Sequence, residues 1–190
     1  NEVVLITRQG QALRISETDV RVMGRSSRGV CGIKLSDSDE LHAMLRVNPG
    51  EQMLLISESG YGKRIEYDNF NPHGRATRGQ RIYEPDEKSG EIVCAITVRE
   101  EDDVVVMTSL GKTLKTRAAD VRLCGKTARG VHIVNIDSPD FVVGMDRIIN
   151  EEQEISASKA EDPVSGQSSG NGADPAEVSD DSGEDILPEV

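Results

Sequence analysis

The chain has 190 residues, of which 36% are hydrophobic and 29% charged, and its formal net charge is −12. This length suffices for one domain with a sizeable core, and no apolar run approaches the ~20 residues that a membrane-spanning helix needs. We therefore expect no membrane contact. Residues 1–150 carry 21 Lys and Arg against 22 Asp and Glu, whereas residues 151–190 carry one Lys against 12 acidic residues. The acidic excess belongs to the tail, so it does not exclude an anionic partner for the nearly neutral body.

The first predicted elements form a hairpin. An apolar, β-branched run at residues 3–6 leads to a polar turn that ends at Gly10, and a returning strand carries Arg14. Runs rich in β-branched residues and bounded by Gly and Ser turns are typical of antiparallel strands. An irregular stretch over residues 17–23 then ends the hairpin.

A short basic phrase comes next: Gly24-Arg25-Ser26-Ser27-Arg28-Gly29. After it the pattern predicts a third strand at residues 30–35, a short acidic turn, and a fourth strand at residues 41–47. The two glycines of the phrase allow a tight turn and a close approach of the backbone to a partner.

The same order of elements returns twice. The phrase recurs at residues 74–79 as Gly-Arg-Ala-Thr-Arg-Gly and at residues 125–130 as Gly-Lys-Thr-Ala-Arg-Gly. The remaining predicted strands follow the same order: opening runs at 53–56 and 104–107, second strands carrying Arg64 and Lys115, third strands at 80–83 and 131–136, and fourth strands at 92–98 and 141–148.

A repeat of about fifty residues with four strands is typical of a propeller blade. The opening runs are apolar throughout, as expected of strands covered by neighbouring blades on both faces. We predict an all-β fold of three propeller-like blades of four antiparallel strands over residues 1–150. Closed propellers have about 4–8 blades, so we expect further blades upstream of Asn1.

The segment 151–190 is rich in Glu, Asp, Ser, Gly and Pro. It has too little apolar surface to offset the entropy of ordering, so we predict a disordered acidic tail. The tail either solubilises the protein or competes with a nucleic acid for a basic surface, because a tethered polyanion has a high effective concentration.

The repeated cations are the strongest candidates for a binding site. Each repeat carries one cation on its second strand and two in its phrase, and cations that recur along one surface suit a long, periodic polyanion. Aromatic residues are only 3% of the chain, so stacking platforms for single strands are poorly supplied and duplex backbone contact is favoured. The candidate DNA-binding residues are Arg14, Arg25, Arg28, Lys63, Arg64, Arg75, Arg78, Arg81, Lys112, Lys115, Lys126 and Arg129.

No catalytic or metal-binding pattern accompanies these cations. The three histidines are far apart in sequence, and Gly60-Tyr61-Gly62-Lys63 lacks the spacing and the hydroxyl residue of a phosphate loop. Cys31, Cys94 and Cys124 form no CxxC pair, which is typical of reduced thiols in a cytoplasmic protein. The alternative to nucleic-acid binding is a propeller that binds proteins, although the absence of Trp excludes WD dipeptides.

In the order and spacing of these features, the chain resembles the C-terminal region of the DNA gyrase A subunit. The resemblance covers residues 1–150 and depends on Gly60-Tyr61-Gly62-Lys63-Arg64, the phrases at 74–79 and 125–130, and the acidic tail. The topoisomerase IV A subunit is the near relative. The family's basic box, Gln-(Arg/Lys)-Arg-Gly-Gly-(Arg/Lys)-Gly, does not occur in this sequence and is expected upstream of Asn1.

The resemblance implies a β-pinwheel, a disc of about six blades that exchange strands with their neighbours, of which this chain would supply the last three. It also implies that duplex DNA wraps around a basic rim, so that the enzyme introduces negative supercoils. The implied partners are the rest of the gyrase A dimer and the gyrase B protein, in the cytoplasm with the bacterial nucleoid. No cofactor is expected in this chain, because ATP and Mg²⁺ belong to the gyrase B protein.

Overall fold

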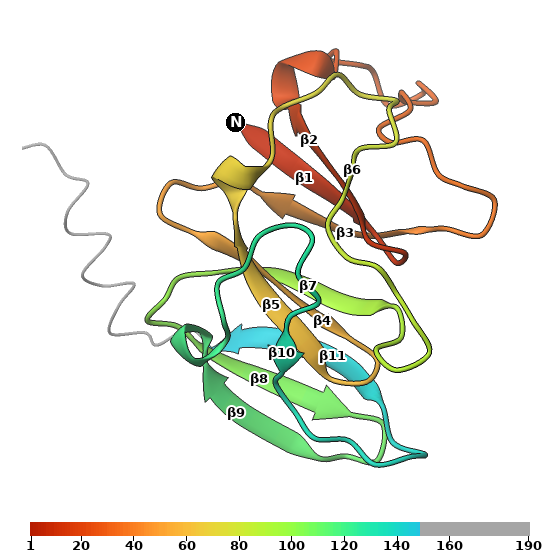
Figure 1. Cartoon of the computed structure of the whole chain (residues 1–190). Helices are drawn as coiled ribbons and strands as arrows, with labels where there is room; N and C mark the ends of the chain where they lie inside the picture. Colours follow the sequence, from red (N-terminus) through yellow and green to blue (C-terminus); the bar gives the residue numbers. More distant parts are fainter. Residues whose placement is uncertain (149–190) are drawn as a thin grey trace, which may run out of the picture.

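The computed structural model describes residues 1–148, which form three β-sheets that follow one another along the chain (Figure 1). Eleven strands and three short 3₁₀ turns make up these residues: β1 (Glu2–Thr7), β2 (Gln11–Ser16), η1 (Glu17–Asp19), β3 (Leu41–Arg46), β4 (Gln52–Ser57), β5 (Tyr61–Glu66), η2 (Tyr67–Asn69), β6 (Gln80–Arg81), β7 (Ile92–Val98), β8 (Asp103–Thr108), β9 (Thr113–Arg117), η3 (Ala118–Asp120), β10 (Val131–His132) and β11 (Val142–Ile148). The prediction of an all-β fold is confirmed.

Neighbouring sheets exchange strands. The sheet orders are β3-β1-β2-β6, β10-β5-β4-β7 and β11-β8-β9. In the first sheet β6 comes from the second repeat and pairs antiparallel with β2, and in the second sheet β10 comes from the third repeat and pairs with β5. Each of these two sheets is therefore completed by the repeat that follows it, as the resemblance to a β-pinwheel implies.

The predicted third strands need correction. They were expected at residues 80–83 and 131–136, but β6 and β10 are only two residues long, and they pair with the preceding repeat. Residues 30–35 form no strand: within residues 1–148 their ladder contact is a single bridge between Ile33 and Thr77. A strand of this kind forms only where a preceding repeat offers the edge of its second strand.

The core lies between the sheets. Met53 and Leu55 of β4 pack in a cluster with Val4 and Ile6 of β1, whereas Leu54 and Ile56 pack with Val104 and Val106 of β8. All four residues of the β4 run are buried. Successive side chains of a strand point to opposite faces, so a run without polar residues is what a sheet covered on both sides requires. The prediction from the apolar runs is confirmed for the second repeat, whereas Val3 of the first run and Val105 of the third are partly exposed and Met107 is exposed.

The predicted tail at 151–190 lies outside the described residues. Within residues 1–148 no helix is long and apolar enough to cross a membrane. Cys31, Cys94 and Cys124 are free thiols in the part of the chain that the structure describes.

Candidate nucleic-acid interface

The three basic phrases form loops, and the second and third are held against the preceding repeat by their closing glycines. Gly79 has φ +73°, and a Cβ there would lie 2.4 Å from the carbonyl oxygen of Ala12. Gly130 has φ +101°, and its Cβ would lie 2.3 Å from the carbonyl oxygen of Gly62. Only glycine combines this backbone angle with this close approach. The repeated glycine that closes the phrase is therefore explained by packing between blades.

The opening glycines have different surroundings. A Cβ at Gly24, Gly74 or Gly125 would meet no atom within 4 Å, and none of the three has a positive φ. The fold does not require glycine at these positions. Their bare backbone is open to a ligand on the outer side of each loop.

The cations of the phrases point outward. Arg25, Arg28, Arg75, Arg78 and Arg129 are exposed, and Lys126 is half-buried. Within residues 1–148, the side chains of Arg25, Arg28 and Arg78 make no salt bridge and no hydrogen bond. Three unpaired guanidinium groups at the surface are available to an anion.

Contacts between the repeats place the loops side by side along the stack of sheets. The N–H of Ala76 donates to the carbonyl oxygen of Gly32 at 2.6 Å, and the N–H of Lys34 donates to that of Thr77 at 2.9 Å. The Lys126 ammonium donates to Oε1 of Gln80, just after the second phrase, at 2.7 Å. We call residues 24–29, 74–79 and 125–130 the basic loop face.

Besides Lys126, two cations of this face are already engaged. Arg75 donates to the carbonyl oxygen of Asp19 at 3.2 Å, and Arg129 forms an ion pair with Asp86. The spacing of the phrases did not predict a role for Gln80 or Asp86. Both residues belong to the second repeat, whereas the cations they contact, Lys126 and Arg129, belong to the third. Both residues fix the position of a cation at the surface, so they belong to the candidate interface as supporting residues.

The structure corrects the predicted site at Arg14 and Arg64. The Arg14 guanidinium donates to the carbonyl oxygens of Tyr67 and Phe70 at 2.8 and 3.1 Å, and it pairs with Glu2. Arg64 is buried; it donates to the carbonyl oxygen of Val121 at 2.7 Å and to that of Ala119 at 3.3 Å. These carbonyls lie in or next to η2 and η3, so each arginine ties its own sheet to the 3₁₀ turn of the next repeat.

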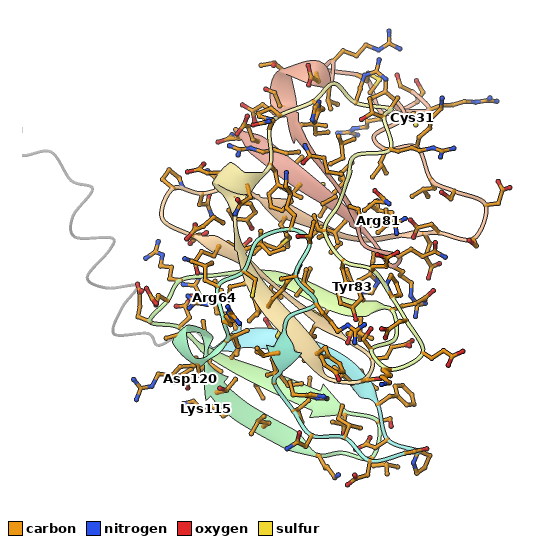
Figure 2. The ribbon with its side chains drawn as sticks, viewed as in Figure 1. Cys31, Arg64, Arg81, Tyr83, Lys115 and Asp120 are labelled. Atoms are coloured by element: carbon orange, nitrogen blue, oxygen red, sulfur yellow. The ribbon has the colours of Figure 1, made fainter. Side chains whose placement is uncertain are left out.

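Lys63 is the third correction. Its side chain is fully buried, and its ammonium donates to the carbonyl oxygens of Gly125, Lys126 and Ala128. Figure 2 shows the neighbouring Arg64 well apart from Cys31 and Arg81. Lys63 therefore supports the third loop of the basic loop face from inside, Arg64 holds the neighbouring η3, and neither contributes charge to the surface of the face.

Burial gives Lys63 a measurable effect on stability. Removal from water lowers the pKa of its ammonium to about 8, whereas an unfolded lysine titrates near 10.4. Between these values the unfolded chain binds more protons than the folded chain, so the free energy of unfolding rises with pH by up to about 1.4 kcal/mol per pH unit.

This pH effect predicts a difference between two chains. We expect wild type to gain on the order of 2 kcal/mol relative to the Lys63→Met variant between pH 8 and pH 10. Urea denaturation of both proteins at each pH measures it, and all other titrating groups cancel in the comparison. A constant difference between the two proteins across this range would contradict the burial of a charged Lys63.

The remaining predicted cations are exposed but paired. Arg81 lies 2.8 Å from Glu84, Lys115 lies 2.8 Å from Asp103, and Lys112 lies 3.9 Å from Asp140. Exposed ion pairs contribute little to stability. Arg81 and Lys115 can exchange a carboxylate for a phosphate at small cost, whereas Lys112 faces the buried carboxylate of Asp140. All three carboxylates lower the local positive charge.

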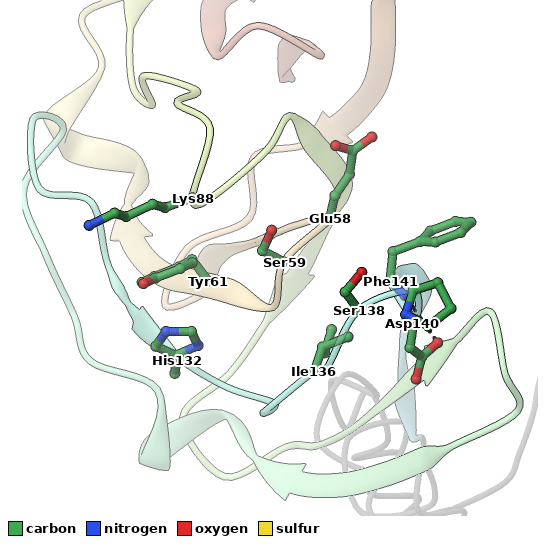
Figure 3. Close-up of a pocket in the computed structure, with 10 residues that line it drawn as sticks. Glu58, Ser59, Tyr61, Lys88, His132, Ile136, Ser138, Asp140 and Phe141 are labelled. Atoms are coloured by element: carbon green, nitrogen blue, oxygen red, sulfur yellow. Dashed lines mark hydrogen bonds between the residues drawn. The ribbon is translucent and has the colours of Figure 1, made fainter.

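A hollow of about 710 Å³ lies between the second and third repeats (Figure 3). None of its lining residues belongs to the basic loop face. Its lining includes Glu58, Lys88 and Asp140, and the rings of Tyr61 and His132 lie 3.8 Å apart. With two carboxylates and one ammonium, the hollow has no excess of positive charge for a phosphate. Among residues 1–148, no group of His, Cys, Asp and Glu could hold a metal ion.

The sequence matches the family described as "DNA gyrase C-terminal domain, beta-propeller" over residues 1–48, 51–101 and 102–149. The chain belongs to this family. The three matched segments coincide with the three repeats, so the family's repeating unit is the unit that the basic phrases mark.

Curated relatives agree with this assignment. The DNA gyrase A subunit of Pseudomonas aeruginosa is 33% identical over 166 residues, which are 87% of this chain and 18% of that protein. The DNA gyrase A subunit of Borreliella burgdorferi is 34% identical over 142 residues, which are 74% of this chain and 18% of that protein. The chain thus spans about a fifth of the length of these relatives.

Two solved structures have the same fold. The structure of a DNA gyrase A C-terminal domain is 34% identical, has a TM-score of 0.72, and the match covers 78% of this chain and 50% of that one. The C-terminal domain of a DNA topoisomerase IV has a TM-score of 0.74 at 20% identity, over 84% of this chain and 51% of that one. At this identity the second likeness shows the fold alone.

Proposed function

We propose that the chain is the DNA-wrapping part of a gyrase A protein, and that duplex DNA lies along the basic loop face. One observation carries the proposal: three cationic loops, repeated in sequence, lie next to one another on one side of the stack of sheets. The unpaired Arg25, Arg28 and Arg78 supply charge, and the uncovered backbone at the opening glycines allows phosphates to approach closely. Neither feature is needed by the fold.

The chemistry favours the duplex backbone over bases. Arginine guanidinium groups suit phosphate oxygens, and no aromatic side chain stands among the phrase residues. Phosphate contacts position DNA without reading its sequence. Binding should therefore tolerate any sequence, as a domain that wraps DNA requires, and many such contacts must offset the several kcal/mol that bending a duplex costs.

The activity proposed for the whole protein follows from its relatives. We infer that the chain acts with the rest of a gyrase A dimer and with the gyrase B protein, in the cytoplasm at the nucleoid, to introduce negative supercoils. The gyrase B protein would hydrolyse ATP with Mg²⁺, and this chain would contribute DNA geometry without a cofactor of its own. The tail would either solubilise the chain or compete with DNA for the loop face.

Salt dependence of DNA binding tests the loop face directly. If the six phrase cations each neutralise one phosphate, affinity should fall about 10³-fold between 50 and 200 mM salt. Substitution of all six by Ala should lower the slope of log K against log salt by about 5. Mobility shift of a short duplex across a salt series measures both quantities. The substituted residues are Arg25, Arg28, Arg75, Arg78, Lys126 and Arg129.

A matched pair of double variants distinguishes the effect of a cation's position on DNA affinity from the effect of net charge. Arg75→Ala with Arg78→Ala removes two cations from the loop face, and Arg46→Ala with Arg99→Ala removes two at the ends of β3 and β7. In the first sheet β3 lies at the edge opposite β6, and in the second sheet β7 lies at the edge opposite β10. We expect the first pair to lower affinity at least ~10-fold and the second to change it less than ~3-fold. Equal losses would contradict a localised interface.

A further inference from the structure

The second and third loops of the basic loop face are held to the preceding repeat in different ways. The second loop uses its backbone: the N–H of Ala76 donates to the carbonyl oxygen of Gly32, and Thr77 forms a parallel bridge with Ile33. This loop also satisfies its own opening carbonyl, because the Thr77 hydroxyl donates to the carbonyl oxygen of Gly74 at 3.3 Å. The second loop therefore needs no hydrogen-bond donor from the sheet beneath it.

The third loop is held by a side chain from the sheet beneath it. The Lys63 ammonium donates to the carbonyl oxygens of Gly125 at 3.2 Å and Lys126 at 2.7 Å, and to that of Ala128. An ammonium has three N–H groups, so its donors match these three acceptors in number. Within residues 1–148 Lys63 forms no salt bridge with a carboxylate. The carbonyl oxygens of the loop are therefore what this buried cation is there to bind.

The residue beneath each loop differs together with one residue inside it. Leu13 lies beneath the second loop and Lys63 beneath the third, and both are fully buried. They occupy the same place, because a Cβ on the closing glycine of each loop would lie 3.1 Å from the Cβ of Leu13 and 3.2 Å from that of Lys63. Where the second phrase has the hydroxyl of Thr77, the third has the methyl group of Ala128. The loop without its own hydroxyl is thus the loop with an ammonium beneath it.

We propose that Lys63 is a positioning residue for DNA binding, whose ammonium replaces the missing hydroxyl and holds the third loop in the form that presents Lys126 and Arg129 to phosphates. The inference rests on the function proposed above for the basic loop face, since Lys63 is buried and contacts no phosphate itself. Lys126 supplies one of the bound carbonyl oxygens, and Arg129 directly follows Ala128, which supplies another. Each cation is therefore within one residue of a fixed point.

Loss of the ammonium would release this loop. A carbonyl oxygen left without a donor inside the protein is costly, and the three carbonyl oxygens of the loop regain hydrogen bonds by turning toward water. The loop would then leave the sheet, and its two cations would lose their fixed positions relative to the second loop.

Limited trypsin proteolysis of the 190-residue chain tests this without DNA. Trypsin cleaves after Lys and Arg, so Arg75 and Arg78 report on the second loop and Lys126 and Arg129 on the third, and mass spectrometry distinguishes the products. In Lys63→Leu, which carries the residue found at this place in the other two repeats, we expect cleavage in the third loop to accelerate at least ~10-fold relative to the second. An unchanged ratio, including equal acceleration at both loops, would overturn the proposal, because equal acceleration indicates a general loss of stability.

Rescue by a hydroxyl tests whether the ammonium acts as a hydrogen-bond donor. The N–H of Ala128 lies 3.3 Å from the carbonyl oxygen of Gly125, so a Thr hydroxyl at this residue reaches the acceptor that corresponds to the one Thr77 uses. Lys63→Leu with Ala128→Thr should therefore recover at least ~3-fold of the lost protection. Lys63→Leu with Ala128→Val is the matched control, since Val has the same branched shape without the hydroxyl, and it should recover none. Equal cleavage of the two double variants would contradict the proposal.

Mobility shift of a short duplex connects the loop to DNA. Lys63→Leu should lower affinity about 10-fold and reduce the slope of log K against log salt by about 1–2, as expected for one or two lost phosphate contacts. Arg46→Leu removes one cation at the end of β3 and should change affinity less than ~3-fold. If affinity falls without opening of the third loop, positioning by Lys63 is wrong. If the loop opens and affinity is unchanged, DNA contact by the third loop is wrong.

Discussion

The Arg64→Ala variant is expected to lose about 3 kcal/mol of the free energy of unfolding. The Arg64 guanidinium is buried, and it donates to the carbonyl oxygens of Val121 and Ala119 and to Oε1 of Gln52. Removing it leaves the carbonyl oxygen of the buried Val121 without a donor, and this loss costs more than the net value of the hydrogen bond itself. Urea denaturation followed by circular dichroism measures the change.

Lys115 is the matched control for Arg64. It occupies the same place in the third repeat, where its side chain is 59% exposed and its ammonium lies 2.8 Å from Asp103. Lys115→Ala should therefore change the free energy of unfolding by less than about 1 kcal/mol.

DNA affinity of the folded Arg64→Ala protein should stay within about threefold of wild type, since one phosphate contact would contribute more. A large loss of affinity with unchanged stability would restore Arg64 to the DNA-binding set and contradict the role described above.

Gly79→Ala and Gly130→Ala are each expected to destabilise the chain by about 3 kcal/mol, of which roughly 1 kcal/mol comes from the positive φ and the rest from steric overlap. A methyl group at Gly79 would meet the carbonyl oxygen of Ala12 at 2.4 Å, and one at Gly130 would meet that of Gly62 at 2.3 Å. These contacts are to backbone atoms of the preceding sheet, so relief requires the loop to separate from that sheet.

Gly29 separates the two contributions. It closes the first phrase with φ +82°, yet a Cβ there would meet nothing within 4 Å. Gly29→Ala should therefore cost only about 1 kcal/mol, which reflects the backbone angle alone. Urea denaturation of the three variants gives the comparison. If Gly29→Ala costs as much as Gly79→Ala, the close approach between repeats is not what requires glycine.

The predicted DNA-binding set shows how far a pattern of charges can be interpreted. The phrase cations were recognised from their recurrence, and the structure places five of the six at the exposed surface. Arg14 and Arg64 recur with the same period but point into the joint between repeats. Periodicity shows that a position matters in every repeat, and it does not distinguish a ligand contact from a contact with the next repeat.

For Lys63 the sequence contained a weaker indication that the side chain is buried. Its counterparts at the same place in the other repeats are Leu13 and Leu114, both apolar. A lysine at an otherwise apolar position of a repeat indicates a buried cation with local partners, and the three carbonyl oxygens of the third phrase supply them. This comparison between repeats was available in the sequence and would have removed Lys63 from the candidate surface.

The sequence by itself determined the repeat, the all-β class, and the first, second and fourth strands of each repeat. These features follow from apolar runs and turn residues, which act through local backbone geometry and burial. Only the tertiary structure decided which repeat completes each sheet and which cations stay in water. Both depend on the surface that a neighbouring repeat presents. The two-residue strands β6 and β10 form because an edge of the preceding sheet is there to receive them, whereas the same segment of the first repeat, Val30 and Cys31, has no such edge within the described residues and forms no strand.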